Sequence, residues 1–232
     1  LSPGRGWVAP ALLAAAPVLL VLKQPDLGTA ILLALLGIAL FHLVGLRLRY
    51  LVAATIAGLA AAPLLWRFLK EYQRQRILVF FDPSLDPLGV GYHIAQSKIA
   101  VGSGGLAGKG FLAASQSQLN FLPENHTDFI FAVLAEQWGF AGSLAVVGLY
   151  AWLIVRALRV AREAKDFLAM ILAYGVFSML ALQVVINLGM VLGILPVVGL
   201  PLPLLSYGGS SMVTTLVAVG LLLNIRMRRF MY

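Results

Sequence analysis

The sequence predicts an all-α fold: a polytopic bundle of membrane-spanning helices with one long extracytoplasmic loop. Of its 232 residues 61% are hydrophobic and only 11% are charged, whereas soluble domains are about 45–50% apolar and about 25% charged. Apolar stretches of roughly 20 residues, the length that crosses a bilayer, also recur along the chain. These observations exclude a disordered chain, a nucleic-acid-binding domain and a conventional soluble enzyme.

Six apolar segments are separated by polar or proline-containing turns. The first is short for a full span and carries Pro17, and the third ends at Trp66 and Arg67, which are typical interfacial anchors. We expect each segment to be a transmembrane helix, because a backbone in lipid must satisfy its own hydrogen bonds. The segments comprise residues 8–22, 27–46, 50–69, 129–155, 167–195 and 212–225.

The net charge of +8 resides largely in short basic clusters between the apolar segments. Three clusters follow the second, fourth and sixth segments: Arg47 and Arg49; Arg156, Arg159, Arg162 and Lys165; Arg226, Arg228 and Arg229. Cytoplasmic loops of membrane proteins are enriched in Lys and Arg, so we expect these clusters in the cytoplasm. The opposite loops, including residues 70–125 and 196–211, then face outside.

We expect a single transmembrane domain over residues 1–232. Within it, residues 70–125 form a long extracytoplasmic loop that is too short and too rich in glycine to be an independent domain. Because the chain begins with Leu1 rather than Met, we expect N-terminal sequence before it. The absence of cysteine excludes a disulfide, a thiolate metal site or a cysteine nucleophile in these residues.

A polar cluster, residues 122–128 (LPENHTD), opens the fourth apolar segment. We expect Asp128 in the first turn of the helix, where a carboxylate favours the helix dipole and needs no other role. A carboxylate at the membrane boundary is also a candidate general base, because partial burial raises its pKa. Glu136, two turns further along, would pair with a buried cation or polar group. The residues alone leave both interpretations of Asp128 open.

Two further polar turns are expected on the same side. Asp26, which follows Pro25, either caps the second helix or faces the same cavity as Asp128. Residues 102–110 (GSGGLAGKG) lack the Ser or Thr that follows the lysine of a nucleotide-binding loop. They form either a flexible loop or, together with Lys98 and Lys109, a site for an anionic headgroup.

Proline and glycine interrupt residues 199–211, just before the last apolar segment. Such a backbone at membrane depth is tolerated only against protein or a water-filled cavity. A re-entrant turn with small residues for close helix packing is one interpretation. Asn187, within the fifth segment, is expected to donate a hydrogen bond between helices.

Together these motifs resemble the SEDS family (shape, elongation, division and sporulation proteins). The resemblance rests on residues 24–29 (QPDLGT), on the 122–131 segment with its HTDFIF run, and on the stretch from Asn187 to the SYGGSS run at 206–211. It covers nearly the whole chain, and the long loop is closer to the elongation branch of the family than to the division branch. The family has ten membrane helices, so four helices and a Gln-Pro-Ser-Glu motif would precede Leu1.

The resemblance implies a peptidoglycan glycosyltransferase that polymerises lipid II during cell elongation and rod-shape maintenance. It would work in a bacterial inner (plasma) membrane with a class B penicillin-binding protein as its transpeptidase partner, and without nucleic acid. Asp128 matches the family's catalytic aspartate. The expected substrate-binding residues are Lys98, Asp26, Glu124, Lys109 and Ser206.

The implied reaction needs one inversion, because the donor sugar is α-linked to a diphosphate and the product linkage is β-1,4. Asp128 would serve as base for the acceptor hydroxyl. The leaving diphosphate would be stabilised by Lys98, by Lys109 or by a divalent cation, Mg²⁺ or Mn²⁺. No resident cofactor is evident in the sequence.

Two other functions stay open. A bundle with intramembrane acids could be a flippase or transporter for a lipid-linked precursor, which would place polar groups near the midplane and on both sides. The polar residues here concentrate outside, which favours chemistry on that face. A scaffold that only activates its penicillin-binding partner would leave Asp128 as a structural cap.

Overall fold

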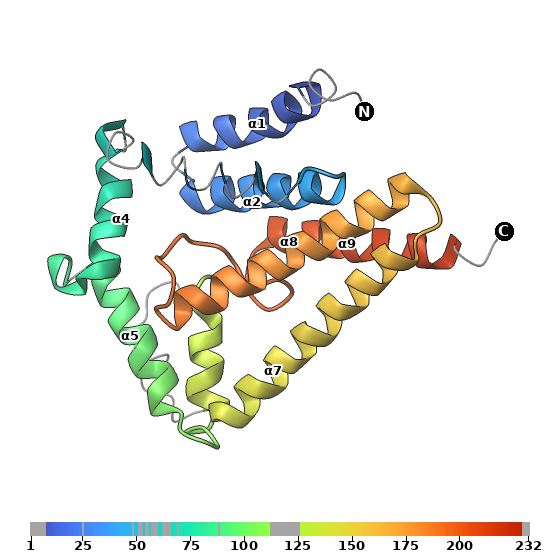
Figure 1. Cartoon of the computed structure of the whole chain (residues 1–232). Helices are drawn as coiled ribbons and strands as arrows, with labels where there is room; N and C mark the ends of the chain where they lie inside the picture. The colour runs from blue at the N-terminus through green and yellow to red at the C-terminus, as the bar shows by residue number, and fades with distance from the viewer. Residues whose placement is uncertain are drawn as a thin grey trace. The chain divides into compact units, whose positions relative to one another are not determined.

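The computed structural model describes residues 8–24, 26–47, 49–50, 53, 56, 60–61, 66–68, 70–87, 89–111 and 126–228. All regular structure in these residues is helical (Figure 1). The helices are α1 (Val8–Lys23), α2 (Leu27–Leu43), η1 (Trp66–Phe68), α4 (Glu71–Phe81), η2 (Pro83–Leu85), α5 (Val90–Ser103), α7 (Ile130–Glu163), α8 (Phe167–Val191) and α9 (Gly209–Arg228). The predicted all-α polytopic fold is confirmed.

Five of the six predicted segments correspond to helices. Helices α7, α8 and α9 are long and apolar enough to cross a membrane. Helices α1 and α2 have 16 and 17 residues, so at about 1.5 Å per residue they are shorter than a hydrocarbon core of about 30 Å. Most of the third segment, residues 50–69, lies outside the described residues.

The chain divides into two compact units, Leu1–Leu69 and Lys70–Tyr232. In the first unit α1 packs against α2 at Gly37, where an added Cβ would lie 3.8 Å from the Cβ of Ala14. Asp26 caps α2 by accepting a hydrogen bond from the backbone N–H of Thr29 at 3.0 Å. The predicted capping turn is therefore confirmed.

The second unit replaces much of the expected long loop with the helices α4 and α5. Buried Ser97 of α5 donates to the carbonyl of Val191 at 2.8 Å, and Arg76 of α4 donates to the carbonyl of Val197 at 3.3 Å. Both helices therefore lie against the end of α8 and the segment after it. Lys98 stands on a helix, not in a loop.

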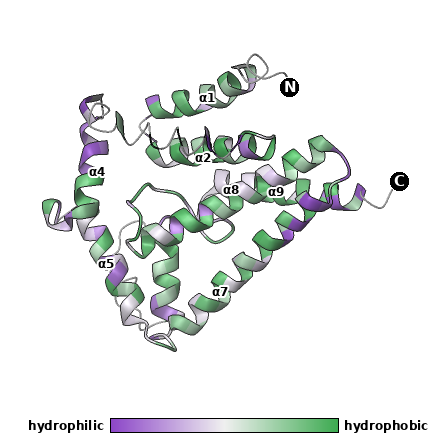
Figure 2. Ribbon diagram, in the orientation of Figure 1, coloured by the Kyte–Doolittle hydropathy of each residue, from purple (hydrophilic) through white to green (hydrophobic). Residues whose placement is uncertain are grey.

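Two apolar clusters hold the helices of the second unit together. One joins small residues near the end of α7, Ala157 and Ala161, to Ala173 of α8 and Ala218 of α9. The other surrounds the beginning of α7 and comprises Ala100, Phe129, Phe131, Ala132, Tyr150, Val184, Met190, Val191 and Leu202. Figure 2 shows hydrophilic residues gathering where α7 ends, beyond the first cluster. Small side chains permit the close approach of membrane helices.

Helix α7 continues past the predicted span, to Glu163. The basic residues Arg156, Arg159 and Arg162 are therefore helical, and the guanidinium of Arg156 lies 5.5 Å from the ring centroid of Trp152. Ala, Leu and Arg are good helix formers, and cations suit a helix C-terminus, which explains the extension.

Helix α7 is broken at Gly139, whose φ is 65° and ψ is −162°. Figure 1 shows the change of direction where the lime segment meets the yellow one. Residues 104–110, here called the strap, satisfy the backbone groups that the break frees. Phe140 and Ala141 donate to the carbonyls of strap residues Gly105 and Leu106 at 2.8 and 3.1 Å.

The strap also satisfies the carbonyls on the other side of the break. Lys109 and Gly110 donate their backbone N–H groups to the carbonyls of Glu136 and Gln137, each at 3.0 Å. In an unbroken helix those carbonyls would accept from residues 140 and 141. Each of these four backbone groups therefore has a partner in the strap despite the break. The strap is thus an ordered part of the fold that packs against α7, not the flexible loop that its glycines suggested.

Candidate functional site

Asp128 lies in a turn, residues 126–129, that precedes the first residue of α7, Ile130. Our prediction that it falls in the first helical turn is wrong by two residues. The carbonyl of His126 accepts from the N–H of Tyr207 at 2.8 Å, and the carbonyl of Thr127 accepts from Ser206 Oγ at 2.6 Å. These carbonyls bind a neighbouring segment, which holds the turn outside the helix.

The neighbouring segment is residues 192–208, here called the α8–α9 loop. Its irregular backbone is held by side chains from within the bundle: Tyr150 Oη donates to the carbonyl of Pro203 at 2.6 Å, and Asn187 Nδ2 donates to that of Leu200 at 2.7 Å. Leu200 and Leu202 are buried. The loop thus lies against protein, as irregular backbone at membrane depth must.

Asn187 joins this loop to the turn that carries Asp128. Its Nδ2 also donates to the carbonyl of Asp128 at 2.9 Å, so one fully buried amide group binds two carbonyls 72 positions apart in sequence. The sequence indicated Asn187 as a donor between helices, but the two acceptors are backbone groups in the turn and in the loop.

We expect Asn187→Ala to destabilise the protein by about 1–3 kcal/mol, because a buried and a partly buried carbonyl lose their donor. The measurement is thermal unfolding of the purified protein in detergent. Asn224→Ala, an exposed asparagine of α9, is the matched control and should leave the midpoint within about 1 °C of wild type, the shift expected of a surface change. Equal midpoints for both variants would contradict a linking role of Asn187.

The side chains of Asp128 and Lys98 both lie against the α8–α9 loop. Asp128 is half-buried, and a Cβ added at Gly199 would lie 3.3 Å from its Oδ2. The Lys98 side chain crosses Gly193, where an added Cβ would overlap Cε and lie 2.7 Å from Nζ. Gly193 also has φ +68°, which other residues rarely adopt. A carboxylate and an ammonium group therefore lie against positions six residues apart in one loop.

Ser206 and Lys109, both predicted to bind substrate, make structural contacts. Ser206 is buried, and its hydroxyl accepts from the N–H of Leu202 at 2.7 Å besides donating to Thr127. Lys109 Nζ lies 3.0 Å from Oε1 of Glu136. The prediction that Glu136 pairs with a cation is confirmed, and the partner comes from the strap.

The other two predicted substrate-binding residues are Asp26 and Glu124. Asp26 belongs to the first unit, where it caps α2. Glu124 lies outside the described residues. Within the described ranges, no three His, Asp or Glu side chains come together as a metal-binding group.

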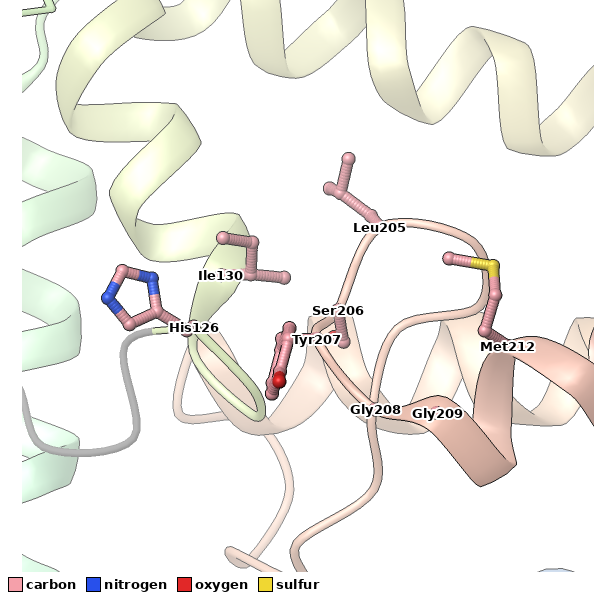
Figure 3. Close-up of a pocket in the computed structure, with 8 residues that line it drawn as sticks. All are labelled: His126, Ile130, Leu205, Ser206, Tyr207, Gly208, Gly209 and Met212. Atoms are coloured by element: carbon pink, nitrogen blue, oxygen red, sulfur yellow. The ribbon is translucent and has the colours of Figure 1, made fainter.

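A pocket of about 630 Å³ opens beside the turn and the α8–α9 loop (Figure 3). Figure 3 shows Ile130 and Leu205 on its walls and Met212 at the start of α9. His126 and Tyr207 add two rings to its lining, and Tyr207 is 81% exposed. Neither ring was among the predicted site residues, although both residues belong to the HTDFIF and SYGGSS runs. The mixed lining suits a ligand with polar and apolar parts.

The fold and this site define a helical membrane protein with polar groups gathered at the beginning of α7. The chain matches the family of cell cycle proteins named for FtsW, RodA and SpoVE over residues 2–230, and it belongs to that family. The predicted SEDS resemblance is therefore confirmed.

Two curated relatives are peptidoglycan glycosyltransferases. MrdB of Escherichia coli (strain K12) is 52% identical over 216 residues, 93% of this chain and 58% of MrdB. RodA of Treponema pallidum (strain Nichols) is 47% identical over 163 residues, 70% of this chain and 38% of that protein. These relatives support the predicted similarity to the elongation branch. The chain spans less than two thirds of their length.

Two solved structures share the fold. One is a chain from a study of how a peptidoglycan synthase complex coordinates polymerization and crosslinking, with a TM-score of 0.81, 37% identity, and coverage of 97% of this chain and 62% of that one. The other is the rod shape determining protein RodA of Thermus thermophilus, with a TM-score of 0.65, 32% identity, and coverage of 99% and 59%.

Proposed function

We propose that this chain is part of a peptidoglycan glycosyltransferase that polymerises lipid II during cell elongation. Family membership and relatives named for this activity support the proposal. The observation that carries it is the anchoring of Asp128, because donors from α8 and the α8–α9 loop bind three successive carbonyls of its turn. A carboxylate so held is preorganised for one task.

Asp128 accepts the proton of the acceptor 4-hydroxyl in the proposed reaction. The hydroxyl oxygen forms the new bond to the anomeric carbon of the donor, the bond from that carbon to the diphosphate oxygen breaks, and the configuration inverts. The diphosphate leaves with the electron pair of the broken bond. Lys98 supplies positive charge to this leaving group, because an ammonium group stabilises an oxyanion most where charge develops.

The proposed placement is a bacterial inner (plasma) membrane, with the Asp128 end of the bundle outside. The basic residues at the opposite ends of α7 and α9, such as Arg159 and Arg226, support a cytoplasmic position for those ends. The partner is a class B penicillin-binding protein that supplies the transpeptidase. The synthase complex among the solved structures supports such an assembly.

The test is to supply labelled lipid II to the complete protein and its penicillin-binding partner in vesicles. We expect glycan polymer, resolved by gel electrophoresis, and none from vesicles with the partner alone. A flippase assay with the same vesicles distinguishes the proposed glycosyltransferase from a lipid II transporter. Lipid II translocation without polymer would replace the proposed enzyme with a transporter.

We expect Lys98→Gln to lower kcat/KM for lipid II by about 10²-fold, the order lost with one group that stabilises a developing oxyanion. Lys98→Arg keeps the charge and should retain more of the activity. Lys165→Gln removes a lysine charge beyond the far end of α7 and serves as control. Equal kcat/KM in Lys98→Gln and wild type would remove Lys98 from the proposed site.

A divalent cation, Mg²⁺ or Mn²⁺, stays a proposal. The oxygens of the substrate diphosphate, together with water, would supply most ligands of such an ion, since Mg²⁺ usually takes only one or two carboxylates from the protein. Such an ion would neutralise charge on the diphosphate. We expect EDTA to slow polymer formation and added Mg²⁺ or Mn²⁺ to restore it. Full activity in EDTA would show that no divalent cation is needed, and Lys98 would then be the group that stabilises the leaving diphosphate.

A further inference from the structure

We propose that Lys109 and Glu136 form a positioning device: their ion pair fixes residues 130–138 of α7, and through them the carboxylate of Asp128. Lys109 acts through Glu136 and does not contact the substrate. The inference rests on the proposed function, because Asp128 is the group being positioned.

Lys109 is attached to Glu136 twice. Its backbone N–H donates to the Glu136 carbonyl at 3.0 Å, and its Nζ lies 3.0 Å from Oε1 of the same residue. One strap residue therefore fixes both the main chain and the side chain of one helix residue. A lysine that only served a solvated loop would need neither contact.

The carboxylate of Glu136 has no access to solvent, whereas the Lys109 side chain is 30% exposed. An unpaired buried charge is strongly unfavourable, so Glu136 requires its cation. The positive charge of Lys109 is balanced by this carboxylate, which leaves it poorly suited to stabilise a leaving diphosphate. Lys98 lies instead against the same loop as Asp128.

The strap approaches α7 by main chain, not by side chain. A Cβ added at Gly104 would overlap the carbonyl oxygen of Ala135, and one at Gly108 would overlap that of Gln137. Glycine at these two positions lets the backbones touch. The strap end of residues 130–138 is therefore held by the ion pair, by backbone hydrogen bonds and by direct backbone packing.

Residues 130–138 form a short rod held at both ends. Nine helical residues span about 13 Å at about 1.5 Å per residue. The turn at the other end is bound by Asn187, Ser206 and Tyr207, and Phe131, Ala132 and Ala135 are buried along the rod. A shift at the strap end therefore moves the turn that carries Asp128. A misplacement of about 1 Å can cost about 10²-fold in rate.

The kinetic test uses the complete protein with its penicillin-binding partner and lipid II. We expect Lys109→Gln to lower kcat at least about 10-fold, within the cost of such a misplacement, and to keep KM within about twofold. Lys109→Arg keeps the pair and should retain kcat, and the charge exchange Lys109→Glu with Glu136→Lys should restore most of it. Lys165→Gln is the control for loss of a lysine.

Three kinetic results would each overturn the proposal. A raised KM with unchanged kcat in Lys109→Gln would make Lys109 a substrate contact, as would a folded charge-exchange variant no more active than Lys109→Gln. If Lys109→Gln does not fold, the double variant Lys109→Gln with Glu136→Gln removes both charges and leaves no buried charge unpaired. It should show the same fall in kcat, and a wild-type kcat would equally reject the proposal.

A second measurement is independent of catalysis. This chain contains no cysteine, and His126→Cys places a thiol two residues before Asp128 in the same turn. Its alkylation by a maleimide is read on its own peptide by mass spectrometry. We expect Lys109→Gln to change the alkylation rate at least threefold and the charge exchange to restore it. Unchanged rates reject the inference. Absence of polymer from wild type would reject the proposed function, while the alkylation rates would still decide the positioning role.

Discussion

Asp128→Asn is expected to abolish glycan polymer formation, with a loss of kcat of about 10²–10⁴-fold. The amide keeps the size of the carboxyl group but cannot accept the proton of the acceptor hydroxyl, and general base catalysis contributes about this factor. The hydrogen bond from Asn187 goes to the backbone carbonyl of Asp128, so the turn should stay in place. The measurement is single-turnover polymer formation from labelled lipid II, with thermal unfolding and partner binding measured in parallel.

Asp166→Asn is the matched control for this change. Asp166 caps α8 by accepting from the N–H of Ala169 at 2.6 Å, and asparagine caps a helix as well as aspartate does. This variant should make polymer at the wild-type rate. Wild-type activity in Asp128→Asn would reduce Asp128 to a structural residue and move the search for the base to Glu124, Asp26 or the part of the enzyme outside this chain.

Gly139→Ala is expected to destabilise the protein by about 2–6 kcal/mol. Position 139 has φ +65°, where an alanine is strained by about 1–3 kcal/mol. Its Cβ would also overlap the backbone N of Gly108 and lie 2.8 Å from the carbonyl carbons of Leu106 and Ala107. Forcing atoms into such a contact costs a further 1–3 kcal/mol, roughly the penalty of an overpacked core. Thermal unfolding in detergent measures the sum.

Gly148→Ala lies in the same helix and is the control. An added Cβ there meets nothing within 4 Å, and alanine is a better helix former than glycine by up to about 1 kcal/mol. We expect this variant to unfold at or above the wild-type temperature. If Gly139→Ala and Gly148→Ala unfold at the same temperature, the strap does not pack against α7 as closely as the structure shows.

The sequence was most informative where a structural cause is local. A bilayer demands long apolar segments, so α7 and α8 were predicted to begin within one residue of their observed starts. The cap at Asp26 needs only a neighbour three residues away. Helices α4 and α5 were missed, because neither has the apolar run of roughly 20 residues that marks a membrane span.

The connections within the site could not be predicted. Asn187 and Asp128 are 59 positions apart, and Ser97 and Val191 are 94 apart. In each case the acceptor is a backbone carbonyl, which every residue possesses and which therefore leaves no trace in the sequence. The pairing of Glu136 with Lys109 was half predicted, since a buried acid requires a cation but does not say which one.

The strap has a consequence for sequence variation among related enzymes. The strap binds α7 through main-chain groups, so most strap side chains make no contact on which the packing against α7 depends. Leu106, which is 79% exposed, should drift freely during evolution, whereas Gly104, Gly108 and Gly139 should change only together with the course of the backbone. Relatives that lack a glycine in α7 at this place should therefore also have a strap of different length.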